Sequence, residues 1–277
     1  MPAGGHPDWL RPDWDAPGVG ALMTTRAGGI SEGAFASMNL RDGLGDSPAA
    51  VAHNQAVFAA AIGARPVWLN QVHGAAVVRL GPELLGQLPT ADASICTEPG
   101  LACTVQVADC LPVLFAAPGA TFPRGVGGAH AGWRGLAGGV LEATIAALCD
   151  AAACAPGELQ AWLGPCIGPR QFEVGADVLQ AFGALPIERD QTHFRYAPRP
   201  DGAPRWLANL QGLARQRLER LGVGLILAEP ACTFEDESRF FSYRRDGGRH
   251  PPSPSGRMAA AIWLQAGTAI APRDGRR

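Results

Sequence analysis

Three short segments each place one metal-ligating side chain in a Gly- or Pro-containing turn beside an apolar strand. They are NQVHG with His73, ADCLP with Cys110 and HAGWRG with His130. Turns held by a rigid scaffold are a common location for catalytic and binding residues. A thiolate and two imidazoles form a ligand set that suits zinc, and three protein ligands leave the fourth tetrahedral position open to water or substrate.

The spacing of these residues matches no short metal-binding signature, so two other interpretations stay open. Cys110 and one of the histidines have the residue types of a thiol nucleophile and its base. The three side chains are also compatible with buried residues whose hydrogen bonds are satisfied. Asp109, next to the cysteine, is a candidate to orient a ligand imidazole through a hydrogen bond. The small residues around His130 allow the backbone and a flat ligand to approach closely.

The composition argues against several classes of protein. With 277 residues, 47% of them hydrophobic and 17% charged, the chain has the balance of a globular protein. No run of about 18 apolar residues predicts a membrane span, and no secretory signal is recognisable, so we expect a cytoplasmic location. A net charge of −2 argues against a nucleic-acid partner. Seven cysteines without a CxxC pair argue against a disulfide framework and a zinc ribbon.

The hydrophobic pattern predicts interleaved strands and helices. Helices are expected over residues 47–63, 136–153, 172–185 and 206–222, and strands over 19–31, 67–80, 101–117, 160–168, 222–229 and 257–265. Residues 188–204 read as a polar loop. Because the helices are too few for regular βαβ alternation, we expect an α+β fold with mixed sheets. An irregular N-terminal arm over residues 1–20 precedes a single catalytic domain over residues 21–270.

The three motifs, taken with others along the chain, closely resemble the laccase-domain family. The matching segments are TTRAGGIS, GDSP, LNQVHG, ADCLPVL, HAGWRG, LGPCIGP with FEVG, and FFSYRRDGG followed by SGR. Bacterial members are known as YfiH-type proteins, purine nucleoside phosphorylases, peptidoglycan editing factors or multi-copper polyphenol oxidases. The resemblance runs in the family's order from about Met23 to Leu264. Where the family usually has Thr-Gly-Arg, this chain has Ser255, Gly256 and Arg257, which keeps the hydroxyl.

The resemblance implies a single α/β/β/α-type sandwich with a zinc ion held by His73, Cys110 and His130. It implies phosphorolysis of adenosine, inosine and S-methyl-5′-thioadenosine, together with deamination of adenosine. The implied partners are therefore a purine nucleoside and phosphate, while the oligomeric state stays open. Copper is the less favoured metal, because a trinuclear copper cluster demands many more imidazoles than the six histidines present.

Phosphorolysis requires an anion-binding group near the metal, and the chain contains arginine but no lysine. A planar guanidinium binds phosphate through two hydrogen bonds. The candidates are Arg26, Arg134, Arg244 and Arg245. Among them Arg26 is preferred, because it lies in a Gly-Gly turn beside a strand end. Asn39 and Gln71 are candidate hydrogen-bond partners of the ribose or base, and Phe241 and Tyr243 are candidates for stacking on the purine.

Two alternative functions use the same residues. The peptidoglycan editing name implies an amidase that removes a misincorporated L-serine from a cytoplasmic cell-wall precursor. There Cys110 is the nucleophile, with His73 or His130 as its base. A non-enzymatic alternative keeps zinc as a structural ion in a binding module. Structural zinc sites usually have four protein ligands, and Cys166 or Cys232 is then the expected fourth.

Overall fold

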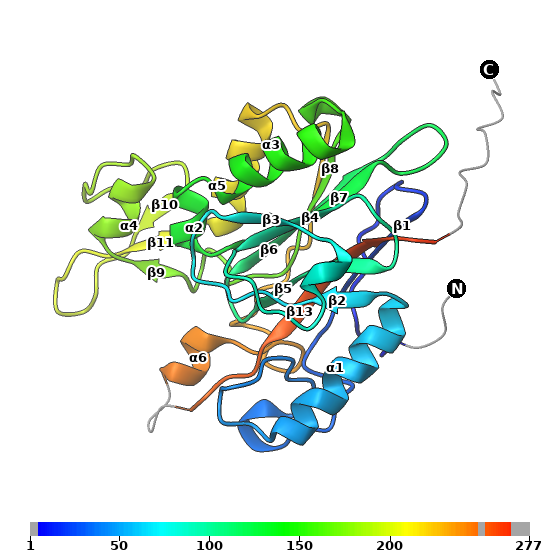
Figure 1. Cartoon of the computed structure of the whole chain (residues 1–277). Helices are drawn as coiled ribbons and strands as arrows, with labels where there is room; N and C mark the ends of the chain where they lie inside the picture. The colour runs from blue at the N-terminus through cyan, green and yellow to red at the C-terminus, as the bar shows by residue number, and fades with distance from the viewer. Residues whose placement is uncertain (1–4, 249–252, 267–277) are drawn as a thin grey trace.

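The computed structural model describes residues 5–248 and 253–266, and two packed β-sheets form its centre (Figure 1). The strands of a four-stranded sheet follow the order β1 (Val19–Met23), β13 (Met258–Leu264), β5 (Leu101–Val107) and β2 (Arg65–Val67). Those of a six-stranded sheet follow the order β12 (Leu225–Ala228), β8 (Gln160–Leu163), β6 (Leu111–Ala117), β7 (Gly125–Ala131), β4 (Ala93–Cys96) and β3 (Val77–Arg79). Both sheets contain parallel and antiparallel pairs, which confirms the expected mixed pairing.

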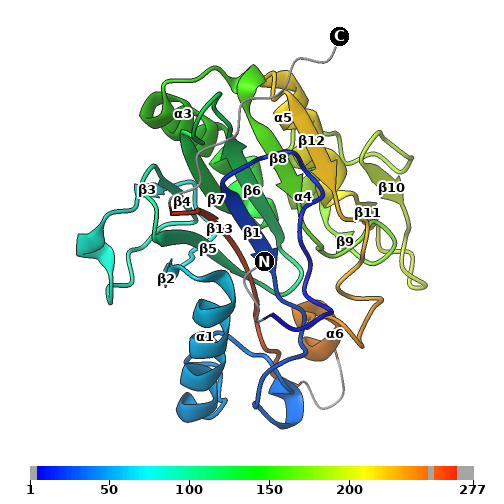
Figure 2. The same ribbon diagram turned by 90° about the vertical axis from the view of Figure 1, so that its right-hand side faces the viewer.

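Helices cover the outer faces of the two sheets (Figure 1, Figure 2). The α-helices are α1 (Pro48–Ile62), α2 (Trp133–Ala137), α3 (Val140–Ala152), α4 (Ala176–Ala181), α5 (Leu210–Arg220) and α6 (Tyr243–Gly247). Short 3-10 helices are η1 (Gly33–Phe35), η2 (Pro82–Leu84) and η3 (Pro156–Glu158). Helix α1 begins and ends as the sequence predicts. Its Ser47 hydroxyl accepts the Ala50 amide at 3.4 Å, and Gly63 ends it in the left-handed conformation at φ 63°.

Alternating side chains of the strands build three hydrophobic layers. Along β13, Ala260 and Ile262 pack into the core between the sheets, whereas Ala259 and Ala261 pack with Phe58 of α1. The six-stranded sheet follows the same period of two, and its outer face packs against α3 and α5. Sheets buried on both faces account for the nearly continuous apolar runs in the sequence. The α/β/β/α sandwich is therefore confirmed.

Local pattern alone omits strands β4 and β7 and is wrong over the region that forms a third sheet. A third sheet pairs β10 (Phe194–Tyr196), β11 (Trp206–Ala208) and β9 (Glu173–Val174). Its strands replace the first residues of the helices predicted over 172–185 and 206–222, and part of the loop predicted over 188–204. Helix α5 starts only after Asn209, whose side chain accepts the Gly212 amide at 2.9 Å. The pairing of Trp206 with Tyr196 and Val174 therefore overrides the local helical pattern.

The N-terminal arm lies on the domain. Strand β1 begins at Val19, and Leu10 forms an isolated bridge with Met23. The Trp9 side chain is buried and donates to the Ala27 carbonyl at 2.9 Å. Residues 267–270 of the predicted domain lie outside the described residues. Within the described ranges, no helix is long and apolar enough to cross a membrane.

The chain crosses between the two large sheets at the predicted turns. Residues 68–76 connect β2 of one sheet to β3 of the other, and residues 108–110 connect β5 to β6. His73 and Asp109 adopt positive φ angles of 61° and 89° in these crossings, a conformation uncommon for residues other than glycine. His73 and Cys110 thus lie where the sheets meet, next to His130 near the end of β7.

The N-cap of α5 gives a stability prediction. Asn209→Ala removes the only side-chain acceptor for the first turn of this helix among the described contacts. We expect the free energy of unfolding to fall by about 1 kcal/mol. Urea denaturation followed by circular dichroism measures the change. The control is Arg220→Ala at the exposed end of the same helix, which should change stability by less than about 0.5 kcal/mol. Equal stabilities for the two variants would contradict the capping role.

Candidate metal centre

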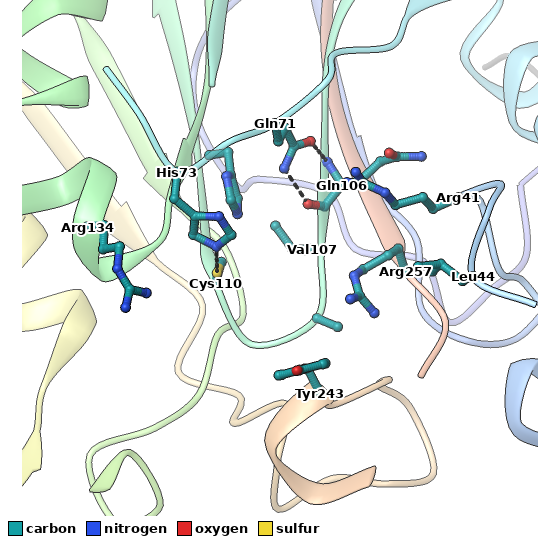
Figure 3. A pocket seen from close by; sticks show the side chains of 12 residues that line it. Arg41, Leu44, Gln71, His73, Gln106, Val107, Cys110, Arg134, Tyr243 and Arg257 are labelled. Carbon is teal, nitrogen blue, oxygen red and sulfur yellow. Dashed lines mark hydrogen bonds between the residues drawn. The ribbon is translucent and has the colours of Figure 1, made fainter. Parts of the chain in front are cut away.

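His73, Cys110 and His130 lie side by side at the point where the two sheets meet. Figure 3 shows the first two of these side chains. The Sγ atom of Cys110 is 3.6 Å from Nε2 of His73, and the two imidazole ring centroids are 4.8 Å apart. One ligand atom from each residue falls within 4.8 Å of the other two. In the described part of the chain this is the one group of three or more such residues able to hold a metal ion.

A buried carboxylate, Asp92, positions both imidazoles. Its Oδ1 atom accepts a hydrogen bond from Nδ1 of His130 at 2.8 Å, so Nε2 of that ring is available to a ligand. The same carboxylate accepts the backbone amides of Val72, His73 and Gly74 at 3.1, 2.9 and 2.6 Å. Burial raises the pKa of Asp92, but these hydrogen bonds and the His130 charge outweigh burial and lower it. Asp92 therefore stays ionised.

The electrostatics of the centre favour a thiolate. Burial disfavours the charged form of Cys110, but the charge of His130 and hydrogen bonds from both imidazoles lower the pKa of the thiol to about 6. Burial also opposes protonation of His130, yet the Cys110 thiolate and the hydrogen bond to Asp92 raise its pKa to about 9. Both metal binding and nucleophilic attack require the thiolate form.

The glycines around His130 allow the three ligands to approach one another. A Cβ atom on Gly132 would lie 2.7 Å from Cδ2 of His73 and 3.0 Å from Sγ of Cys110. A Cβ atom on Gly135 would lie 2.7 Å from the Gly74 carbonyl oxygen. The low side-chain bulk of HAGWRG is thus required by close packing against the turn that carries His73.

A cavity of about 450 Å³ opens beside the three ligands. Volumes of this order accommodate small organic ligands. The lining residues are Arg41, Leu44, Gln71, His73, Gln106, Val107, Ala108, Cys110, His130, Arg134, Tyr243 and Arg257. Figure 3 shows His73 and Cys110 on one side of the cavity and Arg41 and Arg257 on the other, with Tyr243 below. The cavity therefore combines the ligand group, three arginines and one tyrosine ring.

Some of the predicted substrate residues line this cavity. Gln71 does, although its amide is paired with the Gln106 backbone by bonds of 2.8 and 2.7 Å. Arg134 lines it from the ligand side, with its guanidinium 4.2 Å from the Trp133 ring. Tyr243 lines it with 64% of its surface exposed.

Other predicted residues lie elsewhere. Asn39 is fully buried and bonds to Asp46 and to backbone groups. The Arg26 guanidinium donates to the Ala36 and Glu237 carbonyls and lies 4.8 Å from the Phe241 ring. Neither Asn39 nor Arg26 lines the cavity.

The neighbouring arginines bond to backbone groups. The Arg244 side chain donates to the Glu173 carbonyl at 2.9 Å, and Arg245 donates to the carbonyls of Thr233, Phe234 and Phe240. Phe241 is fully buried as a core residue. Asp109 does not orient an imidazole; its carboxylate accepts from the Thr233 and Ser242 hydroxyls and from the Arg244 amide, which holds the turn containing Cys110.

Sequence reasoning missed three residues of the site. Asp92 carries a recognisable signal, because it is a single charge within the apolar segment TADASIC, just before β4. Arg257 belongs to the SGR segment but has no local feature that sets it apart from the other arginines. Arg41 follows Asn39 in NLRDG without a motif of its own. Cys166 and Cys232, the expected ligands of a closed zinc site, do not join the ligand group in the described residues.

A buried carboxylate–histidine pair, a cysteine and a second histidine at the end of a cavity define a candidate metal centre in an α/β/β/α sandwich. The model of a family described as multi-copper polyphenol oxidoreductase laccase matches residues 20–265, and the chain belongs to this family.

Relatives of the chain cover nearly its whole length. A Pseudomonas aeruginosa protein named purine nucleoside phosphorylase is 46% identical over 259 residues, which cover 93% of this chain and 98% of that one. The Escherichia coli K12 purine nucleoside phosphorylase YfiH is 43% identical over 256 residues, covering 91% and 97%. A crystal structure of a Neisseria meningitidis protein, 42% identical, superposes with a TM-score of 0.80 and covers 94% and 100%.

The Asp92 contacts give a metal-binding prediction. Asp92→Asn replaces a carboxylate that accepts four hydrogen bonds with an amide that has one acceptor oxygen. We expect metal affinity to fall roughly 10- to 100-fold, measured by competition with a chromophoric chelator. Asp177→Asn, an exposed carboxylate on α4, is the matched control. Wild-type affinity in an Asp92→Asn protein with native circular dichroism would exclude the positioning role.

The close packing at Gly132 gives a second prediction. Gly132→Ala brings a methyl group against His73 and Cys110, and overpacking of this kind costs about 1–3 kcal/mol. We expect at least a roughly tenfold loss of metal affinity in the same competition assay, because the strain falls on two ligands. Gly157→Ala, whose added Cβ meets its nearest neighbour at 3.6 Å, should bind metal like the wild type. Unchanged affinity in Gly132→Ala would show that the ligands tolerate displacement.

Proposed function

We propose that the protein is a zinc-dependent purine nucleoside phosphorylase acting on adenosine, inosine and S-methyl-5′-thioadenosine, with adenosine deaminase activity. The observation that carries the proposal is the ligand group at the end of a cavity that is also lined by three arginines and an exposed tyrosine. The names of the relatives from Pseudomonas aeruginosa and Escherichia coli support the same activity. The seven free cysteines agree with action in the reducing cytoplasm.

The donor set fits zinc. Tetrahedral coordination with Zn–N of about 2.0–2.1 Å and Zn–S of about 2.3 Å separates a sulfur from a nitrogen ligand by about 3.6 Å. Cys110 Sγ and His73 Nε2 are 3.6 Å apart. No methionine, the usual axial ligand of a mononuclear copper site, is among the residues that line the described cavity. When bound, such a zinc ion acts as a Lewis acid and lowers the pKa of a coordinated water.

The cavity walls fit a nucleoside with its base toward Tyr243. An exposed aromatic ring offers a stacking face to a purine. Gln71 keeps one amide hydrogen for a substrate oxygen, because Nε2 carries two hydrogens and the Gln106 carbonyl takes one. The paired hydrogen bonds between Gln71 and the Gln106 backbone also fix the loop before His73 onto β5. These contacts orient the nucleoside beside the ligand group.

Both proposed reactions use this one position of the nucleoside. In phosphorolysis a phosphate oxygen bonds to C1′ of the ribose while the C1′–N9 bond breaks. The bonding electron pair leaves with the purine, which takes up one proton, so that free base and ribose 1-phosphate form. In deamination, water adds at C6 of adenosine, and ammonia leaves to give inosine. Only phosphorolysis requires an anion site.

Product analysis tests the proposal. We expect inosine turnover to depend on inorganic phosphate and to yield hypoxanthine and ribose 1-phosphate, with about one zinc per chain by elemental analysis. Cys110→Ala should lose the zinc and at least about 100-fold in kcat/KM. Cys149→Ala, at the end of α3, is the control and should retain both. Phosphate-dependent turnover at the wild-type rate in metal-free Cys110→Ala would refute the proposal.

One observation favours a second candidate, a cysteine amidase acting on a cell-wall precursor that carries L-serine. The lowered pKa of Cys110 and its 3.6 Å contact with His73 fit a thiolate nucleophile and its base.

Chelation separates the two candidates. Nucleoside turnover should stop when the metal is removed and return when zinc is added. An amidase should survive chelation and lose activity when iodoacetamide alkylates Cys110.

A further inference from the structure

Two arginines form the side of the cavity opposite the ligand group. Figure 3 shows Arg41 and Arg257 reaching into the cavity from the side facing His73 and Cys110. The two guanidinium groups come from segments more than 200 residues apart in sequence, and both line the same cavity. Neither forms an ion pair with a carboxylate in the described part of the structure. No described carboxylate therefore forms an ion pair with the positive charge on this side of the cavity.

The donors of Arg257 are only partly used. Its Nη1 atom donates to the carbonyl oxygens of Ser255 and Gly256 at 2.7 and 3.0 Å, which fixes the guanidinium against its own loop. Among described residues, Nε and Nη2 have no hydrogen-bond acceptor. Burial and then the charge of Arg41 lower the pKa of Arg257, and a bound anion would favour its charged form. Charges withdrawn from water are normally paired in proteins, and no carboxylate among the described residues pairs with Arg257.

Asn39 connects the backbone segments that carry the two arginines. Its Oδ1 atom accepts the backbone amides of Arg41 at 3.2 Å and Arg257 at 2.9 Å. Its Nδ2 atom donates to the Arg41 carbonyl and to the Asp46 carboxylate, at 3.0 and 2.9 Å. The Leu40 amide adds a bond of 3.0 Å to the Arg257 carbonyl. The two segments are thus locked together beneath the cavity before any ligand arrives, which reduces the cost of ordering on binding.

We propose that Arg41 and Arg257 form an oxyanion clamp that binds the inorganic phosphate consumed in phosphorolysis, with Asn39 as its positioning residue. This inference rests on the proposed function. Arg26 and Arg244, chosen from the sequence for this role, bond to backbone carbonyls outside the cavity. Guanidinium groups bind tetrahedral oxyanions through paired charged hydrogen bonds, and a phosphate held between Arg41 and Arg257 faces the ligand group across the cavity.

Steady-state kinetics of single variants test the clamp. Arg257→Gln and Arg41→Gln should each raise the KM for phosphate roughly 10- to 100-fold, because each removes charged hydrogen bonds worth about 1.5–3 kcal/mol. The KM for inosine and the rate of adenosine deamination, which uses water, should stay within about threefold of wild type. Arg257→Lys keeps the charge but loses the paired geometry, so its KM for phosphate should lie between those of the wild type and Arg257→Gln. Arg195→Gln, an exposed arginine on β10, is the matched control.

Direct binding gives a readout independent of turnover. Isothermal titration of the zinc-loaded protein with inorganic phosphate should show binding that Arg257→Gln weakens by the same factor. Asn39→Ala should also raise the KM for phosphate while the rate of deamination persists. General loss of structure would instead reduce both activities. Wild-type phosphate KM and Kd in the Arg257→Gln and Arg41→Gln variants, or the same effect from Arg244→Gln instead, would overturn the clamp.

The test separates the clamp from the proposed function. If the wild type binds phosphate in an Arg257-dependent way but shows no phosphate-dependent turnover of nucleosides, the clamp stands and the phosphorylase proposal fails. If phosphorolysis occurs and the arginine variants are indistinguishable from wild type, the phosphorylase proposal stands and the clamp fails. Arg257-dependent binding of adenosine 5′-monophosphate without binding of inorganic phosphate would overturn the assignment to the cosubstrate.

Discussion

The site depends on the hydrogen bonds that the buried carboxylate of Asp92 accepts. An ion without exposed surface costs several kcal/mol unless hydrogen bonds compensate it, and here three backbone amides and one imidazole do so. The amides belong to the turn that carries His73, and the imidazole is that of His130. One buried charge therefore determines where two of the three ligands lie. The third, Cys110, is fixed separately by the bonds of Asp109 to neighbouring segments.

Much of the fold could be predicted because its signals are local. Helix α1 has its N-cap, N1 proline and terminal glycine within one segment, and the long apolar runs of β5, β6 and β13 indicate strands buried on both faces. The short strands β9, β10 and β11 could not be predicted in this way. Trp206 and Leu207 fit a helical stripe equally well, and only their pairing with distant residues makes them a strand.

The residues of the site likewise divide into those with a local sequence signal and those without one. His73, Cys110 and His130 could be identified because each belongs to a short segment of distinctive composition, although His130 lies in strand β7 and not in the predicted turn. Roles assigned to arginines had only local context to support them. The Arg26 side chain donates to a carbonyl 211 residues away, at Glu237, and such a partner leaves no trace in neighbouring residues. Arg41 and Arg257 are likewise joined only by the folded chain, through Asn39. Asp92 was the one omission with a local signal.

The crossings of the chain between the two sheets have a thermodynamic consequence. Because the three ligand atoms converge only after both sheets have docked, an unfolded chain cannot offer them together, and an ion that binds them binds the native state alone. Occupancy is then coupled to global unfolding: an ion present at 100 times its dissociation constant adds about 2.7 kcal/mol to the stability of the chain. A bound ion would in this respect join the two halves of the sandwich, to an extent set by its concentration.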